Sequence, residues 1–219
     1  PFPCLTNGIA MSAGLILLVV ILIALAGFFL GRRRAMVSVG GDPRKLHSLP
    51  GYYGQTVFIF AAAPALLLFA VWALLQPLYV ENRVSGLIDP ADIAEGSSLS
   101  LVMADVRRIG DGIDFLVLNS GQSETDIASM DAAEVDVRKL LAGVGVALGS
   151  DVNRSVFEAA KAFRGTNQTL HIVRAAVVIL ASLASSLFAY SRLTPEYRAR
   201  NVTEAAIKAL LIMCSTVAI

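Results

Sequence analysis

Acidic side chains in the polar middle of the chain are the first candidates for chemistry. Asp111 and Asp114 lie three residues apart, and paired carboxylates can act as a general acid and a general base. A denser run follows, made up of Glu124, Asp126, Asp131, Glu134 and Asp136. The run lacks the glycine and the terminal glutamate of a calcium-binding loop. We therefore interpret these carboxylates as the solvated face of a small polar domain.

A pair of arginines beside two glycines is the next candidate. Arg107 and Arg108 precede Gly110 and Gly112, and guanidinium groups with backbone N–H groups can bind an anion. Residues 81–164 carry 14 acidic and 8 basic side chains, and a net negative segment does not attract phosphate over a distance. A helix-surface role for the two arginines is the favoured interpretation.

Histidine and cysteine are too few and too scattered to form a metal or nucleophile site. The chain has two of each: His47 and His171, Cys4 and Cys214. It contains neither an H-E-x-x-H zinc motif nor a G-x-x-x-x-G-K-[ST] phosphate loop. The sequence predicts no catalytic residue, no metal and no cofactor, and leaves the substrate-binding residues unknown. It argues against an enzyme.

The composition and the placement of charge indicate a membrane protein. Of 219 residues, 56% are hydrophobic and 16% are charged, against roughly 45–50% and 25% in soluble domains. Residues 1–31 contain no charged side chain, and the basic residues outside 81–164 flank apolar stretches. A nucleic-acid-binding protein would instead cluster its basic residues on one folded surface, so we expect a lipid bilayer and no nucleic acid as the environment.

Apolar runs predict an all-α membrane protein with three transmembrane helices and the start of a fourth. A spanning helix needs about 20 mainly apolar residues. Pro64, inside the second run, removes a backbone donor and predicts a kink. The expected segments are an N-terminal tail at 1–11, spans at 12–31, 57–77 and 170–190, connecting loops at 32–56 and 191–207, a polar domain at 78–169, and the start of a fourth span at 208–219.

The basic loops set the expected orientation. Residues 32–56 carry Arg32, Arg33, Arg34, Arg44 and Lys45 against Asp42 alone. Cytoplasmic loops are enriched in lysine and arginine, and the basic segment after the third span follows the same rule. We expect both loops in the cytoplasm, and the N-terminus and the polar domain in the periplasm, with the chain in a bacterial inner membrane.

The polar domain is expected to be small and mostly helical. Three stretches approximate a helical period: Ser98–Leu116, Asp131–Leu148 and Asp151–Phe163, the last with Asp151 as its N-cap. Gly110 and Gly112 weaken the first of these helices, and Phe115–Leu118 could form a short strand.

Small residues four apart in the spans predict close helix packing. Gly27 and Gly31 form a G-x-x-x-G pair in the first span, and this spacing lets helix backbones approach closely. Ala61 with Ala65, and Ala181 with Ser185, repeat it in the other two spans.

The two ends of the sequence suggest a piece of a longer protein. The last apolar run, Ala209–Ile219, would cover roughly 16 Å as a helix, about half of a hydrocarbon core. The residues before Met11 could be native or not.

Two segments resemble a known family. Arg198-Ala199-Arg200-Asn201 with Glu204 matches an R-A-R-N-x-x-E stretch that precedes the first core span of phosphate ABC transporter permeases of the PstC family. The segment KLHSLPGYYG at 45–54, followed by an apolar span, resembles the N-terminal extension of the long form of these permeases. The resemblance covers nearly the whole chain from Met11.

The resemblance implies an accessory N-terminal region of an ATP-driven phosphate importer. It implies a second permease subunit, ATPase subunits and a periplasmic phosphate-binding protein as partners. The chain departs from the family by ending before the permease core, so no translocation or coupling residue is carried over. A membrane-anchored sensor with a periplasmic ligand- or partner-binding domain, and a structural membrane subunit without a ligand, remain alternatives.

Overall fold

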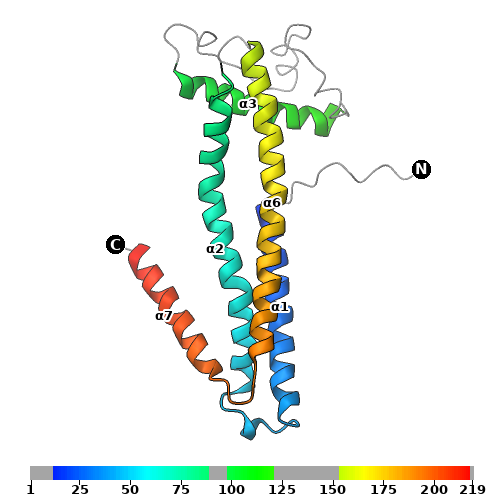
Figure 1. The fold of residues 1–219 in the computed structure, drawn as a ribbon, viewed down its shortest axis with the longest axis vertical. Helices are drawn as coiled ribbons and strands as arrows, with labels where there is room; N and C mark the ends of the chain where they lie inside the picture. The colour runs from blue at the N-terminus through cyan, green and yellow to red at the C-terminus, as the bar shows by residue number, and fades with distance from the viewer. Residues whose placement is uncertain (1–11, 89–97, 121–152, 218–219) are drawn as a thin grey trace, which may run out of the picture. The chain divides into compact units, whose positions relative to one another are not determined.

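The computed structural model describes residues 12–88, 98–120 and 153–217. Within these ranges every regular element is a helix and none is a strand, which confirms the predicted all-α class (Figure 1). The elements are α1 (Ala13–Ser38), a short 3₁₀ turn (Pro43–Lys45), α2 (Pro50–Ser85), α3 (Leu99–Ser120), α6 (Arg154–Arg192) and α7 (Ala199–Val217). The helix predicted at 131–148 lies outside the described residues.

Three of these helices are long and apolar enough to cross a membrane: α1, α2 and α6. They contain the three predicted spans except Ser12, which is the N-cap of α1, and they continue beyond the spans, with 26, 36 and 39 residues. Arg32–Arg34, expected in a loop, form part of the last turns of α1, because arginine is a good helix former. Helix α2 runs through Pro64 without interruption.

The ends of α1 follow local rules. The Leu15 N–H donates to the Ser12 side chain over 3.2 Å, which caps the first turn. After Ser38, Gly40 and Gly41 have φ angles of 67° and 88°, a left-handed backbone that glycine adopts without a Cβ clash. The chain therefore turns there toward α2.

The chain divides into two compact units. The first consists of residues 1–72 and 172–219, and the second of residues 73–171. In the first unit α1, α2 and α6 lie side by side (Figure 1). One buried apolar cluster there contains Ile16, Val20, Ala65, Ala175 and Val178.

Small residues bring α1 and α2 into close contact, as the sequence predicts. A Cβ at Gly31 would lie 2.8 Å from Val57 Cγ2, and one at Gly27 would lie 2.8 Å from Val57 Cγ1. A Cβ at Gly54 would lie 2.6 Å from the carbonyl oxygen of Phe28. These distances leave no space for a methyl group, so the glycines set the separation of the two helices.

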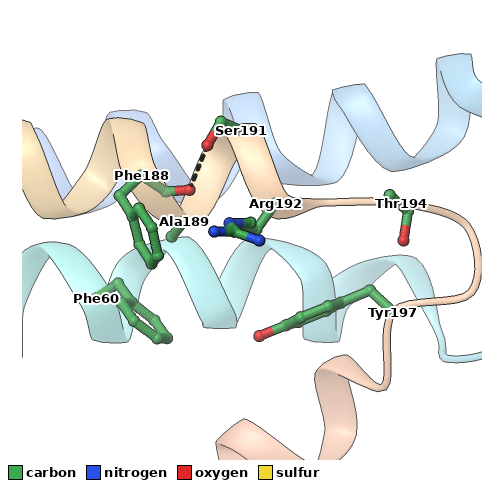
Figure 2. A pocket seen from close by; sticks show the side chains of 7 residues that line it. All are labelled: Phe60, Phe188, Ala189, Ser191, Arg192, Thr194 and Tyr197. Carbon is green, nitrogen blue, oxygen red and sulfur yellow. Dashed lines mark hydrogen bonds between the residues drawn. The ribbon is translucent and has the colours of Figure 1, made fainter.

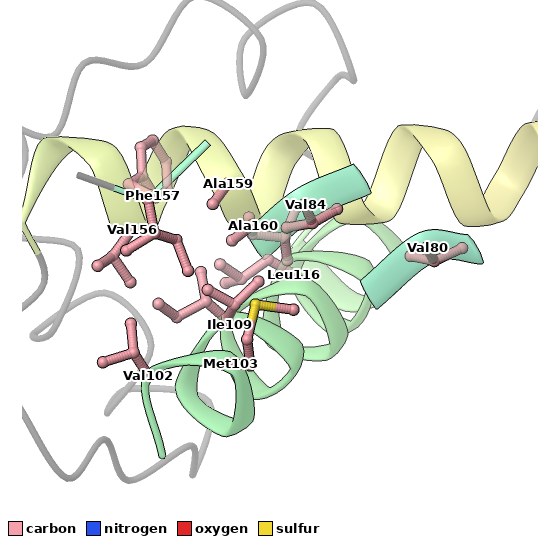
Figure 3. Close-up of a cluster of buried hydrophobic side chains, with 13 residues drawn as sticks. Val80, Val84, Val102, Met103, Ile109, Leu116, Val156, Phe157, Ala159 and Ala160 are labelled. Carbon is pink, nitrogen blue, oxygen red and sulfur yellow. The ribbon is translucent and has the colours of Figure 1, made fainter. Parts of the chain in front are cut away.

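The second unit has its own apolar core, formed by α3 and the adjoining parts of α2 and α6 (Figure 3). Val106 and Ile109 on α3 are fully buried. Gly110 permits close approach to α6, since a Cβ there would lie 3.2 Å from Phe163 Cδ1. The core consists of Val80, Val84, Ile88, Val102, Met103, Val106, Ile109, Ile113, Leu116, Val156, Phe157, Ala159 and Ala160.

One local prediction about this unit was wrong, and two others are refined. Phe115–Leu118 is helical, because it continues the apolar face that buries Leu116. Gly110 and Gly112, which weaken the prediction of this helix, lie inside α3, where tertiary packing outweighs their low helix propensity. The predicted helix at Asp151–Phe163 and the span at 170–190 are one helix, α6, which begins at Arg154. The Phe157 N–H donates to the Asn153 carbonyl oxygen over 3.1 Å in its first turn, and Asp151, the predicted N-cap, lies outside the described residues.

Candidate functional site

The connection between α6 and α7 is joined to the start of α2 by several hydrogen bonds between residues far apart in the sequence. We call this region the α6–α7 junction. Tyr53, on α2, is completely buried there. Its hydroxyl donates to the Pro195 carbonyl oxygen over 2.8 Å, and the His47 backbone N–H donates to the same oxygen over 3.1 Å. Two donors on one carbonyl hold the connection against α2.

Side chains also fix the first turns of α7. Thr56 Oγ1 donates to the Tyr52 carbonyl over 2.9 Å and lies 3.4 Å from the Ala199 carbonyl oxygen. Thr203 Oγ1 lies 3.4 Å from Gln55 Oε1. The R-A-R-N-x-x-E segment therefore begins a helix at a fixed place beside α2. Ala35, Leu46, Tyr53, Val57, Ala189, Leu193 and Ala199 form the buried apolar cluster beneath it.

A pocket of about 520 Å³ opens beside the junction (Figure 2). The rings of Phe60 and Phe188 form one part of its wall, with centroids 6.5 Å apart. The Arg192 guanidinium carbon lies 5.2 Å from the centroid of the Phe188 ring. The remaining lining residues are Ala189, Ser191, Thr194 and Tyr197. One side of the pocket is thus aromatic and the other is polar and cationic.

Basic side chains near the junction are held by aromatic and acidic groups. Arg34 stacks on Tyr190, with 4.4 Å between the guanidinium carbon and the ring centroid. Arg200 Nε donates to Glu204 Oε1 over 2.6 Å, an i,i+4 ion pair inside the R-A-R-N-x-x-E segment. Both interactions are exposed or half-exposed, so they orient side chains more than they stabilise the fold.

The arginines and carboxylates singled out on α3 form ion pairs. Arg107 pairs with Glu81 over 2.9 Å, and Arg108 with the buried Asp105 over 3.5 Å. Glu81 lies on α2, so its pair with Arg107 links two helices at their surface. These contacts confirm the helix-surface interpretation of the arginine pair, and Gly110 serves packing instead of an anion loop.

The two α3 carboxylates differ in environment. Asp114 accepts a hydrogen bond from Arg164 Nε on α6. Burial raises the pKa of Asp111 above its ordinary value, and the nearby Asp114 carboxylate adds to the rise. The other candidate acids, at 124–136, lie outside the described residues.

The histidines and cysteines are separated in the part of the chain that the structure describes. His47 is exposed in the α1–α2 connection, His171 lies within α6, and Cys214 is an exposed free thiol on α7. Cys4 lies outside the described residues. Across 12–88, 98–120 and 153–217, no three metal-ligating side chains gather.

Sequence reasoning missed the junction contacts. Tyr53 stands beside Tyr52 just before the second apolar run, yet it is fully buried and its hydroxyl donates to the carbonyl oxygen of Pro195, 142 positions away. The only signals in the sequence were the tyrosine pair and the proline in the α6–α7 connection. Neither feature indicates that Tyr53 would contact Pro195.

The fold and the junction define the class: a membrane-embedded helical protein with several candidate spans. The chain belongs to the family described as phosphate ATP-binding cassette transporter, whose family model matches residues 17–187. This match confirms the resemblance to phosphate ABC transporters and favours a transporter over a sensor. Comparison with curated proteins and with solved structures gives no match.

Proposed function

We propose that the chain is the N-terminal accessory region of the permease subunit of a phosphate importer. The observation that carries the proposal is the presence of three potential membrane spans in a member of a phosphate ABC transporter family. In such a transporter the permease crosses the membrane, whereas the ATPase and the binding protein lie outside it. The PstC-like segment at 198–204 supports the same assignment.

The charge distribution supports an orientation for this region. Residues 32–56 carry five basic and one acidic side chain, and residues 191–208 carry four basic and two acidic, a basic excess like that of cytoplasmic loops of inner-membrane proteins. The second unit would then lie in the periplasm, where its excess of acidic residues would be solvated. The N-terminus would also be periplasmic.

Helix α7 offers a surface through which the region would contact other transporter helices. Its first turns are fixed at the α6–α7 junction, while Leu210, Leu211, Ile212 and Met213 are 61–66% exposed. Apolar side chains in a membrane protein face lipid or other helices. The second permease subunit is a candidate neighbour, and the second unit could contact a periplasmic phosphate-binding protein.

Phosphate uptake tests the proposal. Cells lacking the gene should lose high-affinity uptake of labelled phosphate and regain it with the wild-type gene. Uptake of an unrelated solute serves as the control. ATPase subunits should co-purify with the tagged full-length protein. Normal phosphate uptake in the deletion strain, without co-purified ATPase, would refute a transport role.

A second variant tests the accessory role of the periplasmic unit. Residues 89–152 would be replaced by a short Gly/Ser linker, which leaves the ends of α2 and α6 in place. If this unit docks the binding protein, uptake falls while the amount in the membrane and the co-purified ATPase stay normal. Unchanged uptake would remove the docking idea and leave the permease assignment standing.

A further inference from the structure

The pocket beside the α6–α7 junction lies at the end of two apolar helical stretches. Phe60 is in the first turn of the apolar run that starts at Val57 on α2, and Phe188 is in the last turns of α6, which ends at Arg192. In a membrane, the two phenylalanines would face the outer part of the hydrocarbon core. Arg192, Thr194 and Tyr197 would reach the headgroup level.

The polar side of the pocket contains hydrogen-bond donors that could bind a ligand. Figure 2 shows the Arg192 guanidinium beside Ala189 and the hydroxyl end of Tyr197 directed toward the phenylalanines. Ser191 Oγ donates to the Phe188 carbonyl over 2.7 Å, so the Ser191 hydroxyl proton already has an acceptor within the chain. Within the part of the chain that the structure describes, no side-chain hydrogen bond or ion pair engages Arg192, Thr194 or Tyr197.

The charge of the pocket selects an anion. Arg192 carries the only formal charge among the lining side chains, and a guanidinium binds phosphate oxygens through two parallel N–H groups. The last carbonyls of α6 would disfavour an anion by themselves, so binding depends on this arginine.

We propose that this pocket binds an anionic glycerophospholipid. The Arg192 guanidinium and the Thr194 and Tyr197 hydroxyls contact the lipid phosphate, and an acyl chain lies along Phe60 and Phe188. A volume of about 520 Å³ is in the range of pockets for whole organic ligands, about 300–1,000 Å³, and the aromatic wall would contribute nothing to binding inorganic phosphate. The proposal requires only that α2 and α6 are embedded in a membrane, so it is independent of the transport role.

Native mass spectrometry of the full-length protein in detergent tests this site. The probes are dioleoylphosphatidylglycerol, dioleoylphosphatidylcholine and inorganic phosphate, each titrated into the wild-type protein. We expect phosphatidylglycerol to bind more tightly than phosphatidylcholine. Arg192→Gln should weaken phosphatidylglycerol binding about five-fold, the effect of about 1 kcal/mol for one basic residue at a membrane surface. Arg44→Gln, an exposed arginine in the other basic connection, is the matched control and should change nothing.

Two further variants keep the test valid if Arg192→Gln misfolds. Tyr197→Phe removes one hydroxyl and should weaken phosphatidylglycerol binding less than Arg192→Gln does. Phe188→Ala should weaken both lipids, because the acyl-chain wall is shared. Equal losses in Arg44→Gln and Arg192→Gln, or equal affinity for the two lipids, would overturn the proposal. Displacement of phosphatidylglycerol by inorganic phosphate at comparable concentration would also overturn it and assign the pocket to the free anion.

Discussion

A single methyl group added at Gly54 should weaken the contact between α1 and α2. In Gly54→Ala the new Cβ would lie 2.6 Å from the Phe28 carbonyl oxygen and 2.8 Å from Phe28 Cδ2. The ring could rotate, but the carbonyl belongs to the backbone of α1. The two helices must therefore move apart.

The size of the effect follows from this distance. Carbon–oxygen contacts in proteins are about 3.3–3.6 Å, so the helices must separate by about 0.7–1 Å. A gap of about 0.5–1 Å forfeits a quarter to a half of the dispersion energy of each contact it opens. Overpacking typically costs about 1–3 kcal/mol. Alanine has a helix propensity better than that of glycine by about 1 kcal/mol, so the net loss of stability is at most about 2 kcal/mol.

Thermal unfolding of the full-length protein in detergent, followed by circular dichroism, measures the loss. Gly51→Ala on the same helix is the matched control, because a Cβ there meets nothing within 4 Å. Both variants replace a glycine of α2 with alanine, so much of the gain in helix propensity is common to both and cancels in the comparison. We expect Gly54→Ala to unfold below Gly51→Ala by about 2–4 °C for each kcal/mol of difference. Equal midpoints would show that these glycines do not set the helix separation.

Three further predictions concern the second unit and the topology. Ile109→Ala should cost about 2–5 kcal/mol, because Ile109 is fully buried, and should lower the temperature at which protease cleaves this unit; unchanged resistance would contradict the described core. The pKa of Asp111 is raised in the fold, so the folded state holds this proton more tightly and stability falls as pH rises above about 4. Asp111→Asn should therefore raise the melting temperature at pH 7 but not at about pH 3. An equal rise of the melting temperature at both pH values would exclude the raised pKa of Asp111 as the cause. In a cysteine-free background, Ser98→Cys should react with an impermeant maleimide in spheroplasts, and Ser38→Cys only after lysis; the reverse pattern would invert the proposed orientation.

Much of the helical architecture was predictable because its signals are local. The three apolar runs fall within α1, α2 and α6, since about 20 apolar residues suffice to indicate a span. The apolar positions of α3 pointed to the face that buries Val106 and Ile109. The helix ends were less predictable, because charged residues such as Arg32 continue a helix as readily as they end one. The strand proposed at 115–118 was wrong for a related reason: a four-residue apolar run fits a strand or a helix, and only its neighbours decide.

The sequence by itself determined the class of protein, the number of apolar helices, the uneven charge and the family resemblance. The G-x-x-x-G spacing indicated close packing, but only the tertiary structure shows that Gly27 and Gly31 face Val57. The tertiary structure alone places Tyr53 on Pro195 and brings Phe60 beside Phe188 to form a pocket. The physical reason is the distance along the chain over which each kind of interaction acts. Hydrophobicity and charge act residue by residue along the chain, whereas a hydrogen bond across 142 residues exists only after the helices have packed.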